Sequence, residues 1–186
     1  MEQTNVTVRE AAADDAPQYA EAVAALIRES AQHHNIHPRN VEDIRRWMTE
    51  GVAVIALDED GIVIGFCYYH LWSDRMVTHS ALVVRPDRRR QGIGRQMKDQ
   101  LHVMVERDVP GAVEISRTTC PVVVHMNERI GLQQCPLSDL TSDPAFWHEC
   151  EHGCRDYALV NAPGSDVGQP NPIGTRCCCT GLIRRQ

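Results

Sequence analysis

The stretch VVRPDRRRQGIGRQMKDQL, residues 83–101, joins the end of an apolar run to a segment with helical spacing. The run MVTHSALVV, residues 76–84, is typical of a strand and stops before Pro86. Beyond the turn, apolar residues recur at helical spacing until Pro110, at Ile93, Met97, Leu101 and Val105. The sequence therefore predicts a strand, a turn rich in arginine and glycine, and a helix.

Such a turn suits the binding of a phosphate-bearing anion. Backbone N–H groups at a helix N-terminus point at an anion, and glycines let the backbone approach it without a Cβ in the way. Two common nucleotide-binding patterns do not fit, however. A P-loop requires Lys and Ser/Thr after its second glycine, and the dinucleotide fingerprint requires a third glycine where Met97 stands. A different diphosphate remains.

Composition and charge narrow the class of protein. The chain has 186 residues, of which 42% are hydrophobic, enough for the core of one domain. The net charge is −6 with dispersed acidic residues, which argues against a nucleic-acid partner. Neither an export signal nor the run of about 20 apolar residues that a membrane span needs is visible. We therefore expect a cytoplasmic protein without a membrane partner.

The rest of the chain alternates strands and helices without an internal repeat. Residues 5–10 and 112–119 have the pattern of single strands, and residues 52–72 that of two strands with a turn at Asp58–Gly61. Helices are predicted within residues 14–30, 40–50 and 122–132, the last ended by Gly131.

The pattern Arg89-x-x-Gly92-x-Gly94 resembles the pyrophosphate-binding signature R/Q-x-x-G-x-G/A of the GNAT superfamily of acyl-CoA-dependent N-acyltransferases. The order of elements matches that fold from about residue 5 to 137, and NERIGL, residues 127–132, is similar to the family's YEKLGF element. The resemblance implies an α/β (α+β) fold with a central, mostly antiparallel mixed sheet of six to seven strands flanked by helices. We expect an acyltransferase domain over residues 1–140 and an irregular Cys-rich extension over 141–186, packed on the same domain.

The resemblance implies acetyl-CoA as co-substrate. Backbone amides of residues 90–95 would hold the pyrophosphate, and the end of the fourth strand would pair with the pantetheine arm. The acyl carbonyl would lie in a V-shaped gap between the fourth and fifth strands, where an amine attacks it directly without a covalent enzyme intermediate. The implied cofactor-binding residues are Leu82, Val83, Val84, Arg89, Arg90, Gln91, Gly92, Ile93, Gly94, Arg95 and Asn127.

The reaction needs a base for the amine and an acid for the departing thiolate. His79 and Glu114 are the candidate bases, and we favour Glu114 because carboxylates acting through water are common in the family. Either could instead only hydrogen-bond a neighbouring strand; Tyr68, Tyr69 and His70 are weaker candidates. Many members carry a tyrosine as the acid where this chain has Asn127, which cannot give up a proton. Water or another residue must then act, or the thiolate leaves unprotonated.

The C-terminal part is similar to a GNAT branch found with arginine-biosynthesis genes and presumed to acylate glutamate or a related amino acid. On this interpretation Arg117, with Thr118 and Thr119, would bind the α-carboxylate of a small amine acceptor. Two alternatives stay open. The chain could acetylate a protein lysine or N-terminal amine, or it could be a non-catalytic module that binds CoA or a partner. A homodimer also stays open.

The chain has eight cysteines, five of them after residue 149. The clusters FWHECEHGCRDY and RCCCTG flank a Pro/Gly-rich loop, an arrangement in which thiolates can close a structural zinc site. The predicted ligands are Cys150, Cys154, Cys177 and Cys179, with His148 or His152 as substitutes. Free thiols or redox chemistry are the alternatives.

Overall fold

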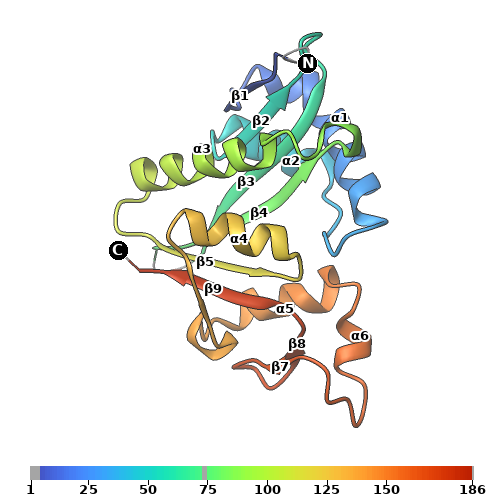
Figure 1. Cartoon of the computed structure of the whole chain (residues 1–186), viewed down its shortest axis with the longest axis vertical. Coiled ribbons are helices and arrows are strands. Elements are labelled where there is room, and N and C mark those ends of the chain that lie inside the picture. The colour runs from blue at the N-terminus through green and yellow to red at the C-terminus, as the bar shows by residue number, and fades with distance from the viewer. Residues whose placement is uncertain (1–4, 73–74, 186) are drawn as a thin grey trace.

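A seven-stranded sheet runs through the molecule in the order β1-β2-β3-β4-β5-β9-β6 (Figure 1). The structure, a computed structural model, describes residues 5–72 and 75–185. Neighbouring strands are antiparallel except β4 and β5, which are parallel. This confirms the predicted fold class. The strands are β1 (Thr7–Glu10), β2 (Ala53–Leu57), β3 (Val63–Leu71), β4 (Met76–Val84), β5 (Val113–Thr118), β6 (Gln133–Cys135) and β9 (Thr180–Arg184).

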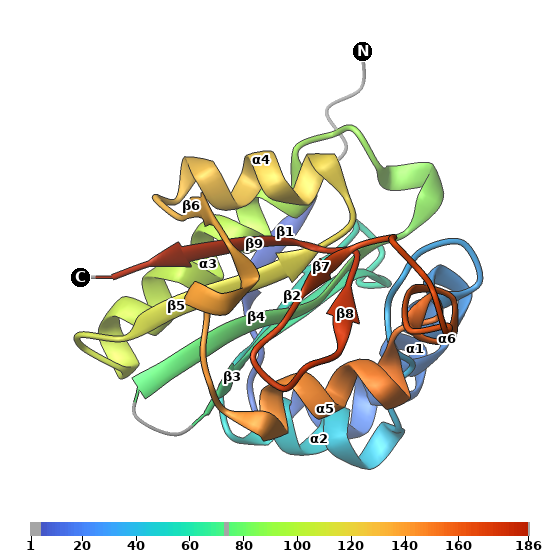
Figure 2. The ribbon, with the colours of Figure 1, turned by 90° about the horizontal axis from the view of Figure 1, so that it is seen from below.

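Helices cover both faces of the sheet, as Figure 2 shows from below. On one face lie α3 (Ile93–Asp108) and α4 (Pro121–Arg129). On the other lie α1 (Asp15–Ala31), α2 (Val41–Thr49) and α5 (Pro144–Gly153). Shorter elements complete the chain: η2 (Pro86–Arg88), η3 (Leu137–Asp139), α6 (Tyr157–Val160) and the hairpin of β7 (Gln169–Pro170) and β8 (Arg176–Cys177).

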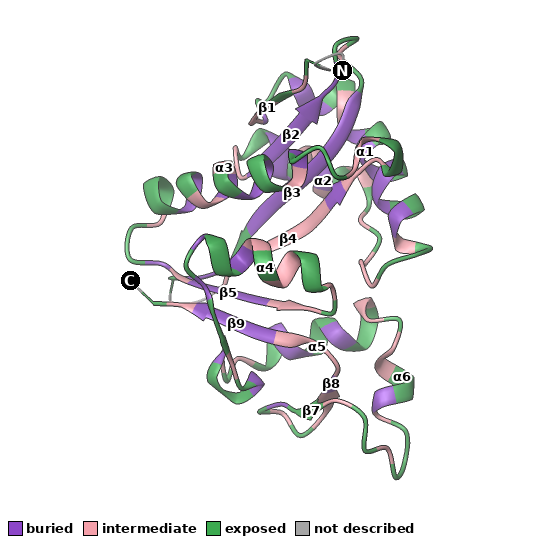
Figure 3. Cartoon of the chain, in the orientation of Figure 1, coloured by how far each residue is buried: buried purple, intermediate pink, exposed green. Residues whose placement is uncertain are grey.

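The alternation of side chains along β3 divides the core into two layers. Phe66 and Tyr68 pack with α1 and α2, whereas Cys67 and Tyr69 pack with α3. This is the period of two that a strand imposes. Every residue of β2 is buried, and Figure 3 shows β2 and most of β3 as buried. The sheet therefore holds β4 rigidly between two packed layers.

The C-terminal part is built into the sheet. Strand β9 lies between β5 and β6 and pairs antiparallel with both, so the last strand of the chain fills an interior position. Helix α5 packs through Phe146 and Trp147 against Ile115 of β5 and Ile183 of β9. The division into residues 1–140 and 141–186 stays a prediction. No helix in the described part of the chain is long and apolar enough to cross a membrane.

Candidate active site

Strands β4 and β5 part in the middle of the sheet. Their pairing joins Met76, Val77 and Thr78 to residues 113–115, and no further pair follows among the described residues. On its other side β4 stays paired to β3, but with a bulge, because Phe66 pairs with Val83 and Tyr68 with Ser80. Ala81 within this bulge has φ 51°, a left-handed conformation that a non-glycine residue rarely adopts. The backbone of residues 80–84 thus faces a gap where β5 would otherwise pair.

The turn after β4 ends at a helix N-terminus without a side-chain cap. Gly92 is the N-cap residue of α3 with φ 80°, and Arg90 also has a positive φ, 65°. A Cβ added to Gly92 would have no heavy atom within 4 Å, so the first turn of α3 is open. Arg89 holds the turn, because its Nε donates to the Val84 carbonyl at 2.9 Å. Uncapped N–H groups and left-handed residues in succession form a concave anion site.

A cavity of about 1040 Å³ connects the gap and the turn. It is open enough on the α3 side to expose Arg90 and Arg95, for which no ion pair is recorded within residues 5–72 and 75–185. Of the predicted cofactor-binding residues, Gln91 and Asn127 do not line it, whereas nine others do: Leu82, Val83, Val84, Arg89, Arg90, Gly92, Ile93, Gly94 and Arg95. The cavity continues past β4 to the predicted acceptor-binding residues Arg117, Thr118 and Thr119.

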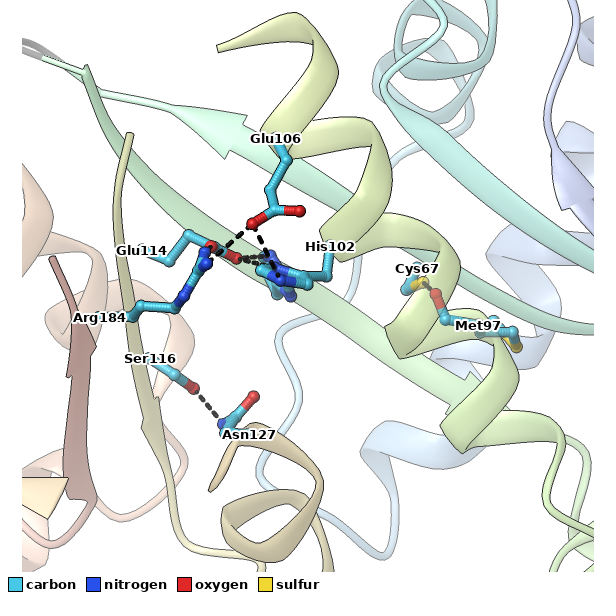
Figure 4. A network of polar contacts seen from close by, with 9 residues as sticks. Cys67, Met97, His102, Glu106, Glu114, Ser116, Asn127 and Arg184 are labelled. Atoms are coloured by element: carbon cyan, nitrogen blue, oxygen red, sulfur yellow. Dashed lines mark hydrogen bonds and ion pairs between the residues drawn. The ribbon is translucent and has the colours of Figure 1, made fainter. Parts of the chain in front are cut away.

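The two candidate bases lie together but in different surroundings. His79 lines the cavity, and its Nε2 lies 3.0 Å from Oε2 of Glu114. Both ring nitrogens of His79 are buried, and neither makes a hydrogen bond of ordinary geometry in the described part of the chain. Glu114 is fully buried and does not line the cavity. It faces His102 Nδ1 at 2.9 Å and accepts from Arg184 at 2.7 Å, as Figure 4 shows.

Burial and these contacts set the charges. Burial lowers the pKa of His79 to about 4, so its imidazole is neutral at neutral pH. Burial alone would raise the pKa of Glu114, but hydrogen bonds from His102 and His79 outweigh it and hold that pKa well below its usual range. The ionised Glu114 accepts from Arg184 and lies within 3.0 Å of His102 and His79. It is not placed to take a proton from an acceptor in the cavity.

Asn127 is fully buried beside β5 (Figure 4). Its Nδ2 donates to Ser116 Oγ at 2.9 Å, and its Oδ1 has no hydrogen-bond partner among the described residues. Ser116 lines the cavity and Asn127 does not, so Asn127 contacts the cavity lining only through this hydrogen bond.

The far end of the cavity carries two arginines. Arg117 NH1 donates to Cys150 Sγ at 2.9 Å, and NH2 donates to Glu149 at 3.3 Å, while the guanidinium lies 4.1 Å from the centre of the Phe146 ring. Arg39, between α1 and α2, also lines the cavity, and its buried Nε has no hydrogen-bond partner in the described part of the chain.

The cysteines predicted as one zinc site form two groups. Thiol hydrogen bonds link Cys177 to Cys150 and Cys179 and lower the pKa of Cys177. Cys154 lies apart from them with Cys178 and Asp156, and the ligand atoms of these three residues are all within 4.8 Å of one another. Asn35 Nδ2 donates to Cys154 Sγ and to Asp156 Oδ2, at 3.2 Å each. All eight cysteines are free thiols.

Sequence reasoning missed several residues of the site. His102 and Arg184 surround Glu114 from α3 and β9, and only the strand order brings Arg184 there. Arg39 lies in a connection without periodicity. Lys98 lines the cavity from α3 and is 2% exposed. For Lys98 the sequence did hold a signal, because it is the only lysine among 19 basic residues.

A strand that parts from its neighbour beside an open helix N-terminus can accommodate an extended ligand that carries a diphosphate. Residues 49–129 match the family model described as Acetyltransferase (GNAT) domain, a range that contains β4, the turn, α3 and β5. Residues 49–129 of the chain therefore resemble a GNAT acetyltransferase domain, in agreement with the predicted enzyme class, an N-acetyltransferase. No curated protein sequence matches the chain.

Solved structures share the fold at low sequence identity. N-acetylglutamate synthase from Neisseria gonorrhoeae, complexed with coenzyme A and N-acetyl-glutamate, is 18% identical with a TM-score of 0.66, over 99% of this chain and 36% of that one. This chain therefore spans about a third of the length of that enzyme. A phosphinothricin acetyltransferase from Sinorhizobium meliloti in complex with AcCoA is 18% identical with a TM-score of 0.62, over 97% and 88% of the two chains. Diaminobutyrate acetyltransferase from Paenibacillus lautus, with L-2,4-diaminobutyric acid and coenzyme A, is 15% identical with a TM-score of 0.57, over 97% and 93%.

Proposed function

We propose that the protein transfers the acetyl group of acetyl-CoA to the primary amine of a small carboxylate-bearing acceptor, such as glutamate or a related amino acid. The observation that carries this proposal is the single cavity of about 1040 Å³ that reaches from the N-terminus of α3, past the bulge of β4, to Arg39 and Arg117. A cofactor and an acceptor can meet in it at the bulge.

The α3 end of the cavity would hold the CoA diphosphate. The uncapped N–H groups after Gly92 would bind its oxygens, and the exposed Arg90 and Arg95 would add positive charge. The pantetheine arm would run beside residues 82–84 of β4, where β5 has left the backbone unpaired. The bulge at Ala81 would then turn a backbone N–H towards the thioester carbonyl and stabilise the oxyanion.

His79 would act as the general base, in place of Glu114, which we favoured from the sequence. Nε2 lies 3.0 Å from the Glu114 carboxylate, so the ring proton would be carried there, and Nδ1 would hold the free electron pair on a residue that lines the cavity. A carboxylate that fixes the tautomer of a base is a general arrangement in acyl transfer. His79 would take the proton of the amine as its nitrogen attacks the carbonyl carbon.

The opposite end of the cavity suits a carboxylate. Arg39 has an unpartnered Nε there, and Arg117 is held in place by Cys150 and Glu149 from α5. A guanidinium binds a carboxylate through two parallel hydrogen bonds. Because α5 and the turn after it also line this end, through residues such as Phe146 and Asp156, the acceptor side is walled and favours a small molecule over a protein.

The test combines a binding measurement with a product assay. Gly92→Glu would place a carboxylate at the diphosphate site, and we expect CoA affinity to fall at least ~10-fold in calorimetry. Gly51→Glu is the matched control, because Gly51 also has a positive φ and open space around its Cβ but lies outside the cavity. Incubation with acetyl-CoA and separate amino acids or a lysine peptide should give an acetylated amino acid by mass spectrometry. Equal CoA affinity in both variants, or acetylation of the peptide alone, would contradict the proposal.

We also propose a structural zinc ion, with ligands that differ from those the sequence predicted. Two thiols and a carboxylate are donors that zinc accepts, and Cys154, Cys178 and Asp156 already lie together. Cys150, Cys177 and Cys179 would stay thiols, since Arg117 already contacts Cys150. Elemental analysis should find about one metal per chain, lost in Cys154→Ser and Cys178→Ser but kept in Cys135→Ser on β6 and in Cys179→Ser. Metal-free protein, or loss in Cys179→Ser alone, would overturn this ligand set.

A further inference from the structure

The choice between lysine and arginine in this chain is unusually one-sided. Its 19 basic residues comprise 18 arginines and one lysine, Lys98. Within residues 5–72 and 75–185, Lys98 is also the only buried lysine or arginine, with 2% of its surface exposed. Burying an ammonium group costs free energy unless the charge is paired and hydrogen-bonded, so such a residue is a candidate for a functional role. Solubility, which explains most lysines on protein surfaces, therefore does not explain the position of Lys98.

Lys98 lies on the cavity side of α3, just beyond the turn that precedes this helix. Lys98, His102 and Glu106 follow one another at intervals of four residues, which places them on one face of the helix. His102 and Glu106 of this face reach Glu114 and Arg184 (Figure 4). Lys98, one turn closer to Gly92, lines the cavity together with His79 and Leu82. Lys98 therefore lines the cavity between the N-terminus of α3 and His79.

The groups around Lys98 come from three strands. It interacts electrostatically with Cys67 of β3, His79 of β4 and Glu114 of β5, and His79 is in turn affected by His102. Burial lowers the pKa of Lys98 to about 8, although Cys67 and Glu114 oppose this shift. The side chain is then charged at neutral pH and can still release a proton. An arginine at this position could not, because guanidinium does not lose its proton in proteins.

We propose that Lys98 protonates the sulfur of CoA as the thioester bond breaks. The amine nitrogen forms the new C–N bond and gives its proton to His79. The C–S bond breaks with its electron pair going to sulfur, and the Lys98 ammonium gives that sulfur a proton, so CoA leaves as a thiol. Solvent then returns a proton to Lys98 and removes one from His79. This assignment rests on the proposed function and supplies the acid that Asn127, outside the cavity, cannot provide.

The first test varies the leaving group. Acetyl-CoA releases a basic alkyl thiolate, whereas 4-nitrothiophenyl acetate releases an acidic aryl thiolate that needs no proton. For Lys98→Met we expect kcat with acetyl-CoA to fall about 100-fold or more. With the aryl donor, kcat/KM should fall less than about fivefold, because proton donation no longer limits the step. Lys98→Arg should behave like Lys98→Met. Gln96→Met, on the exposed face of the same helix, is the control and should keep both rates.

The second test uses the fact that the chain has one lysine. Protein labelled with ¹⁵N-lysine gives one ammonium signal, and its titration in the CoA complex should coincide with the basic limb of the kcat profile. Equal losses with both donors in Lys98→Met, an active Lys98→Arg, or a titration apart from that limb would overturn the proposal. Active wild-type enzyme with an unaffected Lys98→Met would remove this inference alone. Wild-type protein that acetylates no amine would instead remove the proposed function.

Discussion

One carboxylate organises the chemistry of the site at the scale of single residues. Glu114 contacts His79, His102 and Arg184, which belong to β4, α3 and β9. Because Glu114 is shielded from solvent, its electrostatic interactions with these neighbours are stronger than they would be in water. The orientation of His79, and with it the direction of Nδ1, depends on this buried charge.

His79→Gln should therefore lower kcat by about 100-fold or more, because an amide cannot accept the proton. In the wild type, the neutral imidazole is the active form. Since burial lowers its pKa to about 4, the activity should be lost only as the pH falls through that region, and not near the 6.5 of free histidine. The measurement is kcat against pH, with CoA affinity as the control. A variant of unchanged kcat would show that the amine enters already neutral.

Asn127→Ala should leave the chemistry almost intact. The variant loses the hydrogen bond from Nδ2 to Ser116 and also removes the unpartnered Oδ1, so unfolding free energy should fall by only about 1 kcal/mol. Urea unfolding and kcat measure the two effects. A loss of kcat beyond about 100-fold, with CoA still bound, would instead make Asn127 part of the acid–base machinery.

The sequence indicated candidate residues, but not which of them contact one another in the fold. His79 and Glu114 were both found, but their contact depends on the parallel register in which Val77 pairs with Glu114, and that register is set by residues far apart in the chain. Lys98 follows Met97 in a helix with otherwise ordinary spacing, and a lysine there predicts an exposed position. The cysteine clusters indicated thiols close in space, but not which of them meet, since α5 and the last strands are placed by packing.

At the scale of elements, the bulge in β4 is the decisive feature. The strand, the turn and α3 were predictable because each depends on local signals such as Pro86 and Gly92. The bulge was not, because nothing in the stretch HSALVV marks Ala81 for a left-handed conformation. It accompanies the register shift against β3 between Phe66 and Tyr68, which depends on residues distant in sequence.

Substitutions at Ala81 test this imposed conformation. Ala81→Gly should change unfolding free energy by less than about 1 kcal/mol, because relief of the strained φ offsets the greater freedom of the unfolded chain. Ala81→Val should destabilise by about 1–3 kcal/mol and lower acetyl transfer, because a β-branched residue resists positive φ. Guanidinium unfolding and kcat/KM for both variants are the measurements. A valine variant as stable and active as the glycine variant would mean that the bulge is not needed.

At the scale of the whole molecule, ion pairs as well as backbone hydrogen bonds connect β9 to the rest of the fold. Arg184 of β9 donates to Glu114 of β5 at 2.7 Å and to Glu106 of α3 at 2.7 Å. It thereby connects the last strand to the helix that carries the anion site.

Arg184→Met should cost about 3 kcal/mol or more at pH 7, because the buried Glu114 keeps its charge with one partner fewer. The folded protein holds the pKa of Glu114 below its usual range, so this carboxylate stabilises the fold above the unfolded pKa and loses that effect as pH falls. The difference between variant and wild type should accordingly shrink towards low pH in urea unfolding. Arg185→Met, at the exposed neighbouring position, is the control. An equal loss of unfolding free energy in both variants at pH 7 would show that Arg184 does not stabilise the fold through the charge of Glu114.

The interior position of β9 also affects how the chain folds while it is being synthesised. A ribosome delivers β1 to β4 and α3 first, and these elements share local contacts through which they can begin to fold. β5 and β6 emerge next, with the place between them still vacant until residues 180–184 arrive. During that interval each exposes an edge that can accept a strand from another nascent chain. Slow synthesis of residues 136–184 would prolong this exposure and favour association between nascent chains over insertion of β9.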